Sequence, residues 1–277
     1  AATFYGGGIY AQAEAGILSL SLIDCVVKDN VAAHSGGGIA MGGYGEYVTL
    51  IGTTISGNTA SGTGPLMGGG GVFAFGGALE MLNCTVSGNT ASRDGGGLYL
   101  NSTACQINFV TAAGNTANVK GGGMNLTSLS GSIANTIICG NTDGASGTTT
   151  DNVNGTIPGG ANNLRDQDAM LDDLADNGGP TPTHALLTGS PAINNAGAVG
   201  AVTHDQRGVP RDQGNAPDIG AYETVYIAYV DDDYTAESCG GHVWGQDAFA
   251  AIQAGVNAVA VSGTVNVAAG TYAGATI

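Results

Sequence analysis

The chain has 277 residues, among them 50 glycines, and a formal net charge of −16 from 6 Lys and Arg against 22 Asp and Glu. A hydrophobic content of 43% excludes a disordered chain, because disorder requires low hydrophobicity. The few cationic side chains exclude nucleic acid as a partner, and no apolar run approaches the ~20 residues needed for insertion into a membrane.

An asparagine recurs through the first half of the chain, each time ahead of a glycine run or a turn. The stretch SGNTASRDGGGLYL at 87–100 shows the pattern. Successive asparagines are 28, 31, 26 and 26 residues apart, and successive last glycines of the runs are 30, 33, 26 and 26 residues apart. The asparagines are Asn30, Asn58, Asn89, Asn115 and Asn141, and the glycines are Gly8, Gly38, Gly71, Gly97 and Gly123. The one longer interval contains an insertion, GTGPL at 62–66, which we expect in a surface loop.

Apolar residues follow each glycine run at alternating positions, which is typical of a strand with one buried face. A repeat of this length cannot bury that face alone, whereas stacked copies form a continuous core. Residues 1–143 therefore predict an all-β parallel solenoid of about five coils, with neighbouring coils ~4.8 Å apart. In this fold the asparagines form a ladder of stacked amides, and the glycines turn corners that need a positive φ or close backbone approach.

The motif SGNTA…GGGLYL resembles the repeats of bacterial right-handed parallel β-helix proteins. These include pectate-lyase-like surface proteins and proteins with polymorphic outer-membrane-protein repeats. The resemblance covers residues 1–143 and implies a right-handed parallel β-helix at the cell surface or outside the cell.

Residues 144–223 lack the glycine triplets and are rich in turn residues. The segments LADNGGPTPTHALLTGSPAI (174–193), DQRGVPR (205–211) and DIGAYE (218–223) resemble the C-terminal region of bacterial proteins with a choice-of-anchor Q domain. That resemblance implies a loop-rich segment that closes the β-helix, in a surface-anchored or secreted protein. We expect Arg207 and Arg211 to form ion pairs with Asp205 and Asp212 that lock this long loop.

Residues 224–277 predict a strand, an amphipathic helix at 246–260 with Asp247 as its N-cap, and a second strand at 263–272. The order resembles the start of a pectate-lyase-like β-helix, where a short helix covers the open end. Two explanations fit: a segment of a longer tandem protein, or a unit that docks end to end with the next copy. The contact residues for such docking would be Phe249, Ile252, Val256, Val259 and Ile9.

The cationic residues of the repeats offer little for catalysis. A polyuronate lyase needs an Arg or Lys beside acidic calcium ligands, and the repeats hold only Lys28, Arg93 and Lys120 at different phases. A hydrolase needs paired carboxylates at ~5–10 Å, and NTD at 141–143 lacks the companion motifs of the hydrolases it resembles in part. We therefore expect no catalytic residues and no enzymatic activity.

One acidic cluster and five cysteines complete the candidates. Asp231, Asp232 and Asp233 are weak candidates for calcium, but a solvated turn that enters the helix is the favoured explanation, so no cofactor is predicted. The cysteines, Cys25, Cys84, Cys105, Cys139 and Cys239, show no metal-like spacing and are expected mainly as small buried residues. Stacking places Cys25 and Cys84 two coils apart, too far for a disulfide, and leaves the pairing of the other three open.

The sequence favours an extracellular structural or adhesive module of a bacterial surface protein, one that assembles end to end into a filament or packs against neighbouring repeats. Two alternatives stay open. One is a lyase or hydrolase of acidic polysaccharide, and the other is a glycan-binding module that uses exposed aromatic residues such as Tyr10, Phe73 and Tyr99. The organism, the ligand, the anchor and the oligomeric state are not specified by the sequence.

Overall fold

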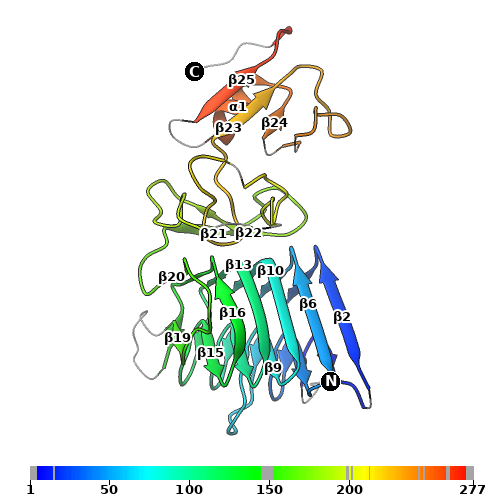
Figure 1. Cartoon of the computed structure of the whole chain (residues 1–277), viewed down its shortest axis with the longest axis vertical. Coiled ribbons are helices and arrows are strands. Elements are labelled where there is room, and N and C mark those ends of the chain that lie inside the picture. Colours follow the sequence, from blue (N-terminus) through cyan, green and yellow to red (C-terminus); the bar gives the residue numbers. More distant parts are fainter. Residues whose placement is uncertain are drawn as a thin grey trace.

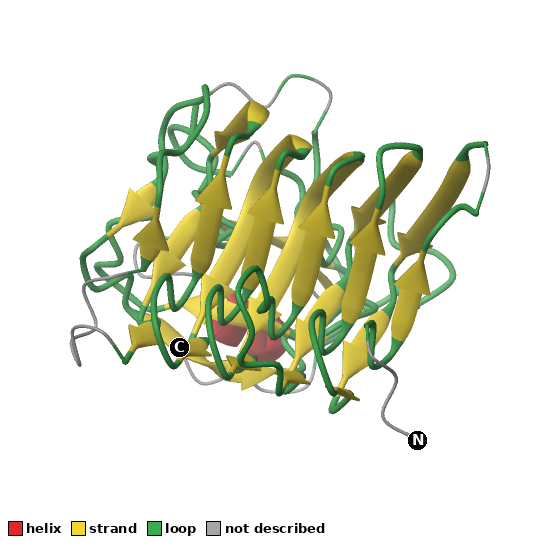
Figure 2. Ribbon diagram, turned by 90° about the horizontal axis from the view of Figure 1, so that it is seen from below, coloured by secondary structure: helices red, strands yellow, loops and turns green. Residues whose placement is uncertain are grey.

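A computed structural model describes residues 5–14, 16–144, 152–197, 200, 202–211, 213–242, 244–245, 247–259 and 263–272. The fold is all-β, with short parallel strands stacked coil upon coil into a solenoid (Figures 1 and 2). The described residues contain a single helix, near the C-terminus. The predicted fold class is therefore confirmed.

Each coil of the solenoid contains three or four strands. The first coil comprises β1 (Ile9–Ala11), β2 (Leu18–Ile23), β3 (Val26–Lys28) and β4 (Val31–Ala32). The second comprises β5 (Ile39–Gly42), β6 (Glu46–Ile51), β7 (Thr54–Ser56) and β8 (Thr59–Ala60). The third and fourth comprise β9 (Val72–Phe75), β10 (Ala78–Ser87) and β11 (Thr90–Ala91), then β12 (Leu98–Asn101), β13 (Ala104–Ala113) and β14 (Thr116–Ala117). The fifth comprises β15 (Met124–Thr127), β16 (Ser130–Ala134), β17 (Ile137–Cys139) and β18 (Thr142–Asp143), and β19 (Val153–Asn154) and β20 (Leu164–Arg165) begin a sixth.

Three parallel sheets run along the solenoid, in the strand orders β1-β5-β9-β12-β15-β19, β2-β6-β10-β13-β17-β20 and β18-β14-β11-β8-β4. Their register matches the repeat, because Ile39 pairs with Ile9 on one side and with Val72 on the other. Side chains at these positions and two residues further point inward. Ile39 and Met41 are fully buried, and each such side chain contributes roughly 2 kcal/mol relative to an exposed one.

Residues 166–223, which we call the flank segment, lie along the side of the solenoid (Figure 1). The segment contains an antiparallel pair, β21 (Leu171–Ala175) and β22 (Thr183–Leu186). The Thr181 hydroxyl donates to the carbonyl of Gly52 in the second coil at 2.7 Å, and the Gly220 amide donates to the carbonyl of Asn135 in the fifth at 2.9 Å. The resemblance implied a segment that closes the end of the solenoid. These contacts instead place it across four coils.

The flank segment covers a second apolar cluster on the outside of the coils. Phe109 has a φ of 54°, which turns its strand at a bend, and its ring is fully buried under the segment. Ile137 and Cys139 in the fifth coil join the cluster, together with Leu186 and Ile219 from the segment. Apolar side chains that face outward from the coils explain why the segment folds back onto them.

The C-terminal unit, residues 224–272, is a small parallel sheet with the order β24-β23-β25 and one helix. Its elements are β23 (Ile227–Val230), β24 (Ala248–Phe249), α1 (Ile252–Ala258) and β25 (Thr264–Val267). The predicted helix at 246–260 is too long at its start, because Ala248 and Phe249 pair with β23 as a strand. Ala251, with no side-chain cap, occupies the N-cap position predicted for Asp247, and residues 246 and 260 lie outside the described part.

Candidate functional site

The five asparagines of the repeat form one continuous ladder. The backbone N of Asn58 and its Nδ2 both donate to Oδ1 of Asn89, at 3.0 and 2.9 Å, and Nδ2 also donates to the carbonyl of Val27. The same pattern joins each asparagine to the next coil. Asn152 adds a sixth rung that the sequence did not suggest, since it follows Asn141 by only 11 residues. The ladder satisfies buried polar groups along the whole solenoid, which is a structural role.

In each glycine triplet, the first and the last glycine are required for different reasons. The positive φ belongs to the first glycine, as in Gly69 with 68°, and not to the last one. The last glycine lies against the ladder: a Cβ on Gly71 would stand 3.1 Å from Nδ2 of Asn89 and 2.8 Å from the carbonyl oxygen of Gly97. Close approach is therefore the reason for glycine at Gly8, Gly38, Gly71, Gly97 and Gly123.

Two of the three cations of the repeats form salt bridges with the carboxyl of the residue that follows them. Lys28 is exposed and lies 3.8 Å from Asp29. Arg93 lies 3.6 Å from Asp94, a single carboxyl that pairs through its backbone with Lys120 in the next coil. Burial raises the pKa of Asp94, and the two nearby cations oppose that shift. Asp94 and these two cations form an internal charged group that joins neighbouring coils.

A serine and a histidine meet where the flank segment crosses the third coil. Oγ of Ser87 lies 2.8 Å from Nε2 of His184, and the backbone carbonyl of Asp172 lies 2.7 Å from Nδ1. This is the spacing of a nucleophile and its base. Ser87 is nearly buried, and neither it nor His184 lines any of the cavities described below. Burial lowers the pKa of His184, so the contact joins two neutral groups and fixes the segment to the coil.

A buried charged cluster holds the flank segment together. Arg207 pairs with Asp205 at 2.8 Å, as expected, whereas Arg211 pairs with Glu223 at 3.3 Å and stacks on the ring of Phe109. Asp212, the predicted partner of Arg211, lies outside the described residues. Burial, reinforced by Asp218, raises the pKa of Glu223 to about 9. The motifs DQRGVPR and DIGAYE thus meet in space, which the sequence did not indicate.

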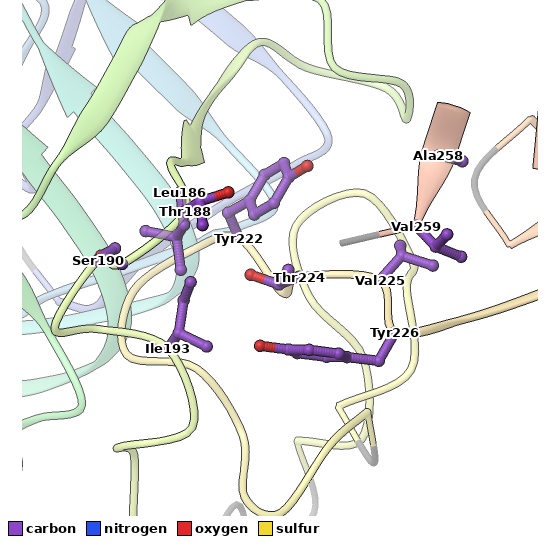
Figure 3. Close-up of a pocket in the computed structure, with 11 residues that line it drawn as sticks. Leu186, Thr188, Ser190, Ile193, Tyr222, Thr224, Val225, Tyr226, Ala258 and Val259 are labelled. Atoms are coloured by element: carbon purple, nitrogen blue, oxygen red, sulfur yellow. The ribbon is translucent and has the colours of Figure 1, made fainter. Parts of the chain in front are cut away.

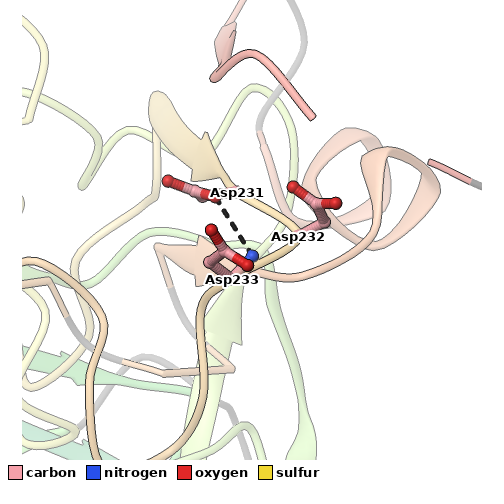
Figure 4. Close-up of side chains that lie close together, drawn as sticks. All are labelled: Asp231, Asp232 and Asp233. Atoms are coloured by element: carbon pink, nitrogen blue, oxygen red, sulfur yellow. Dashed lines mark hydrogen bonds between the residues drawn. The ribbon is translucent and has the colours of Figure 1, made fainter. Parts of the chain in front are cut away.

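The three aspartates of the C-terminal unit come together, with one carboxylate oxygen of each within 4.8 Å of the others. Oδ1 of Asp231 accepts the amide of Asp233 at 3.1 Å (Figure 4). Oδ2 of Asp232 accepts the amide of Thr271 at 2.9 Å. These bonds close the turn that follows β23. The arrangement fits a solvated turn, and it also brings three carboxylates within reach of one ion, so calcium binding here stays a prediction.

A crevice of about 410 Å³ separates the flank segment from the C-terminal unit (Figure 3). Ile193 and Tyr222 line it on one side, and Val259 lines it on the other. Val259 follows α1, whose Gly255 packs closely against Val230 of its own sheet. The residues predicted for end-to-end docking therefore divide: Phe249, Ile252, Val256 and Val259 belong to this unit, and Ile9 belongs to the first coil.

The first coil has one open edge among the described residues. In each of the three long sheets its strand is the edge strand, so β1, β2 and β4 are paired on one side only. Leu20 and Leu22 align with Val48 and Leu50 of the second coil. The second-coil pair is fully buried, whereas the first-coil pair is only partly buried. Within the described residues, the interior of the solenoid is therefore only partly covered at this end.

A groove of about 520 Å³ lies beside this open end, on the outer face of the first three coils. Aromatic side chains dominate its lining, which includes Tyr5, Tyr10, Tyr44, Phe73, Phe75 and Leu66. Phe73 and Tyr99 were expected to be exposed, but they are only 5% and 2% exposed because their rings stack on each other at 5.2 Å. Tyr10 is exposed, as expected, and Tyr44 was missed because it lies in a turn outside the repeat positions.

No family model, curated protein or solved structure matches the chain. Two surfaces of the solenoid are therefore the candidates for function: the open edge of the first coil and the aromatic groove. Within the described residues, no helix is long and apolar enough to cross a membrane.

Proposed function

We propose that this protein is a structural and adhesive module of an extracellular bacterial surface protein, and that its first coil packs against another parallel coil to extend the rod. The open edge of the first coil is the observation that carries the proposal. Unpaired strand edges and uncovered apolar side chains are what a further strand binds. The resemblance to pectate-lyase-like and choice-of-anchor Q proteins supports the extracellular location.

The partner is a coil of the same kind, from a second copy or from a neighbouring repeat of the same polypeptide. Leu18, Leu20 and Leu22 of β2 pack against the core on the side of the second coil. A coil stacked on the other side of β2 would cover the part that is still exposed. Ile23 and Val31 add exposed apolar surface on the same coil, each 56% exposed. Burial of such surface drives association, and parallel strands restore the backbone hydrogen bonds at the edge.

Electron microscopy and light scattering over a range of protein concentrations test the proposal. We expect rods that lengthen with concentration in the wild-type protein. Leu20→Lys should keep the protein monomeric, because the lysine can extend through the open end when alone but would be buried as a charge after stacking. Ser21→Lys is the matched control, because Ser21 is the next residue of β2 and faces outward.

Two results would count against the proposal. One is a wild-type protein that stays monomeric at the highest soluble concentration and shows no binding to a tandem partner. The other is assembly of Leu20→Lys to the same extent as Ser21→Lys, with both variants folded by circular dichroism.

A further inference from the structure

The aromatic groove arises from a local departure from the repeat. Tyr10 of the first coil and Phe73 of the third are aligned on either side of Ala40 in the second. Gly42, also in the second coil, pairs with Phe75 of the third. Ala40 is itself fully buried, whereas Gly42 lines the groove, and its missing side chain leaves a notch beside Tyr10 and Phe75.

Two loops close the ends of this notch. The insertion at 62–66 leads into a tight turn in which the amide of Met67 donates to the carbonyl of Gly64 at 3.3 Å, and it brings Pro65 and Leu66 to the rim. At the other end Tyr44, 75% exposed, follows β5. The insertion that interrupts the repeat is thus a wall of the groove. Its volume lies within the usual range for small-molecule sites, ~300–1,000 Å³.

A ring contact and a hydrogen bond restrain two of the tyrosines that line the groove. Tyr10 stacks on Tyr5 at 5.7 Å and donates its hydroxyl to the Gln12 side chain at 2.5 Å. The ring of Tyr44 lies over Gly76, where a Cβ would stand 3.0 Å from Cδ1 of the ring. A surface that is ordered before binding loses less conformational entropy when a ligand arrives.

The chemistry of the lining selects the class of ligand. The described residues that line the groove include no Lys, Arg, Asp or Glu, and the chain carries a net charge of −16. A polyanion would find no cation to pair with and would be repelled. The polar groups are tyrosine hydroxyls and the Gln12 amide, which both donate and accept hydrogen bonds.

We propose that the aromatic groove binds a neutral oligosaccharide. The faces of a pyranose ring carry C–H bonds, which pack on the electron-rich face of a tyrosine ring, while the sugar hydroxyls bond to the Gln12 amide and the tyrosine hydroxyls. Of the residues that line the groove, only Tyr5, Tyr10 and Gln12 belong to the first coil, and the others, Tyr44 among them, lie on the second and third coils, away from the edge on which a further coil stacks. The site is therefore independent of end-to-end assembly, and either can fail alone.

Titration calorimetry and saturation-transfer NMR test the proposal with uncharged tetrasaccharides of glucose, mannose and N-acetylglucosamine, and with tetragalacturonate as the charged comparison. We expect binding of at least one neutral probe and none of the uronate. Tyr44→Ala should weaken binding about tenfold, the effect of losing one stacking ring. Tyr47→Ala is the matched control, because Tyr47 is 51% exposed on β6 and lies outside the groove.

A second variant blocks the groove without removing a ring. A Cβ on Gly42 would stand 3.6 Å from Oη of Tyr10, an ordinary contact, so Gly42→Leu should fold and fill the notch. It should abolish binding of the neutral probe. The proposal is overturned by failure of every neutral probe to bind, by preferred binding of the uronate, by an equal loss in Tyr44→Ala and Tyr47→Ala, or by occupation of the groove by a second copy of the chain.

Discussion

The carboxamide of Asn89 lies against the backbone of Gly71, at the start of the same coil, so closely that a Cβ on the glycine would stand 3.1 Å from Nδ2. This contact explains why the asparagine and the glycine run recur together. The ladder occupies the space that side chains at the last glycines would fill. The asparagine and the glycine run therefore repeat in the sequence because the same packing contact is made in every coil.

The ladder predicts a large loss of stability for Asn89→Ala. Oδ1 of Asn89 accepts hydrogen bonds from the backbone N and Nδ2 of Asn58. Nδ2 of Asn89 donates to Oδ1 of Asn115 and to the carbonyl of Ile55, and all of these groups are in the buried interior. Each buried group left without a partner costs about 1–3 kcal/mol, so we expect at least ~3 kcal/mol in urea unfolding. Asn118→Ala, at an exposed position, should stay within ~0.5 kcal/mol of wild type. Equal effects of the two changes would contradict the ladder's role.

The glycine contact predicts that Gly71→Ala is more damaging than Gly88→Ala. At Gly71 the new methyl group meets the Gly97 carbonyl oxygen at 2.8 Å and the ladder at 3.1 Å, so two coils must separate. At Gly88 the methyl group meets nothing within 4 Å, and the only cost is its φ of 63°. That left-handed strain amounts to about 1–2 kcal/mol. In thermal unfolding, Gly71→Ala should have a clearly lower Tm than Gly88→Ala. The reverse order would show that the strain of a positive φ costs more than the steric clash of the added methyl group.

The repeat made the coils, their register and the ladder predictable, because every coil must place its apolar residues over those of the next. Features that depend on departures from the repeat were not predictable. Gly42 looks like an ordinary small residue in the sequence, and only its aromatic neighbours, Tyr10 and Phe75, make it part of a groove.

Contacts between distant segments could not be predicted from the sequence for a similar reason. The pairing of Arg211 with Glu223 depends on how the flank segment folds back. The start of the helix was wrong because the spacing around Phe249 fits a helix, whereas its backbone completes a sheet with β23. Periodicity does not distinguish the two in so short a segment.

The five cysteines should divide into two classes by reactivity. All are free thiols, and Cys25 and Cys239 are partly exposed. Burial raises the pKa of Cys84 to about 12 and those of Cys105 and Cys139 to about 11. Because the thiolate is the reactive form, these three should stay unlabelled by Ellman's reagent in the native protein at pH 8 and react only after unfolding. Release of more than two equivalents from the native protein would refute this burial pattern.

The buried charged cluster predicts a pH-dependent stability that Glu223→Gln removes. Burial, with the carboxyl of Asp218 nearby, raises the pKa of Glu223 from 4.5 to about 9. A group with a raised pKa in the native state contributes fully below pH 4.5. That contribution is lost as the pH rises towards 9, because the unfolded chain releases the proton first.

Urea unfolding of wild type and Glu223→Gln between pH 5 and pH 9 measures this contribution. The wild-type free energy of unfolding should fall with pH relative to the variant, by at most ~1.4 kcal/mol per pH unit for one proton. The glutamine keeps the size and the acceptor oxygen of the neutral acid, so the variant should fold. Glu80→Gln, at an exposed carboxyl on β10, controls for the change in net charge and should leave the wild-type slope unchanged. Parallel pH profiles of wild type and Glu223→Gln would show that Glu223 is ionised in the native cluster.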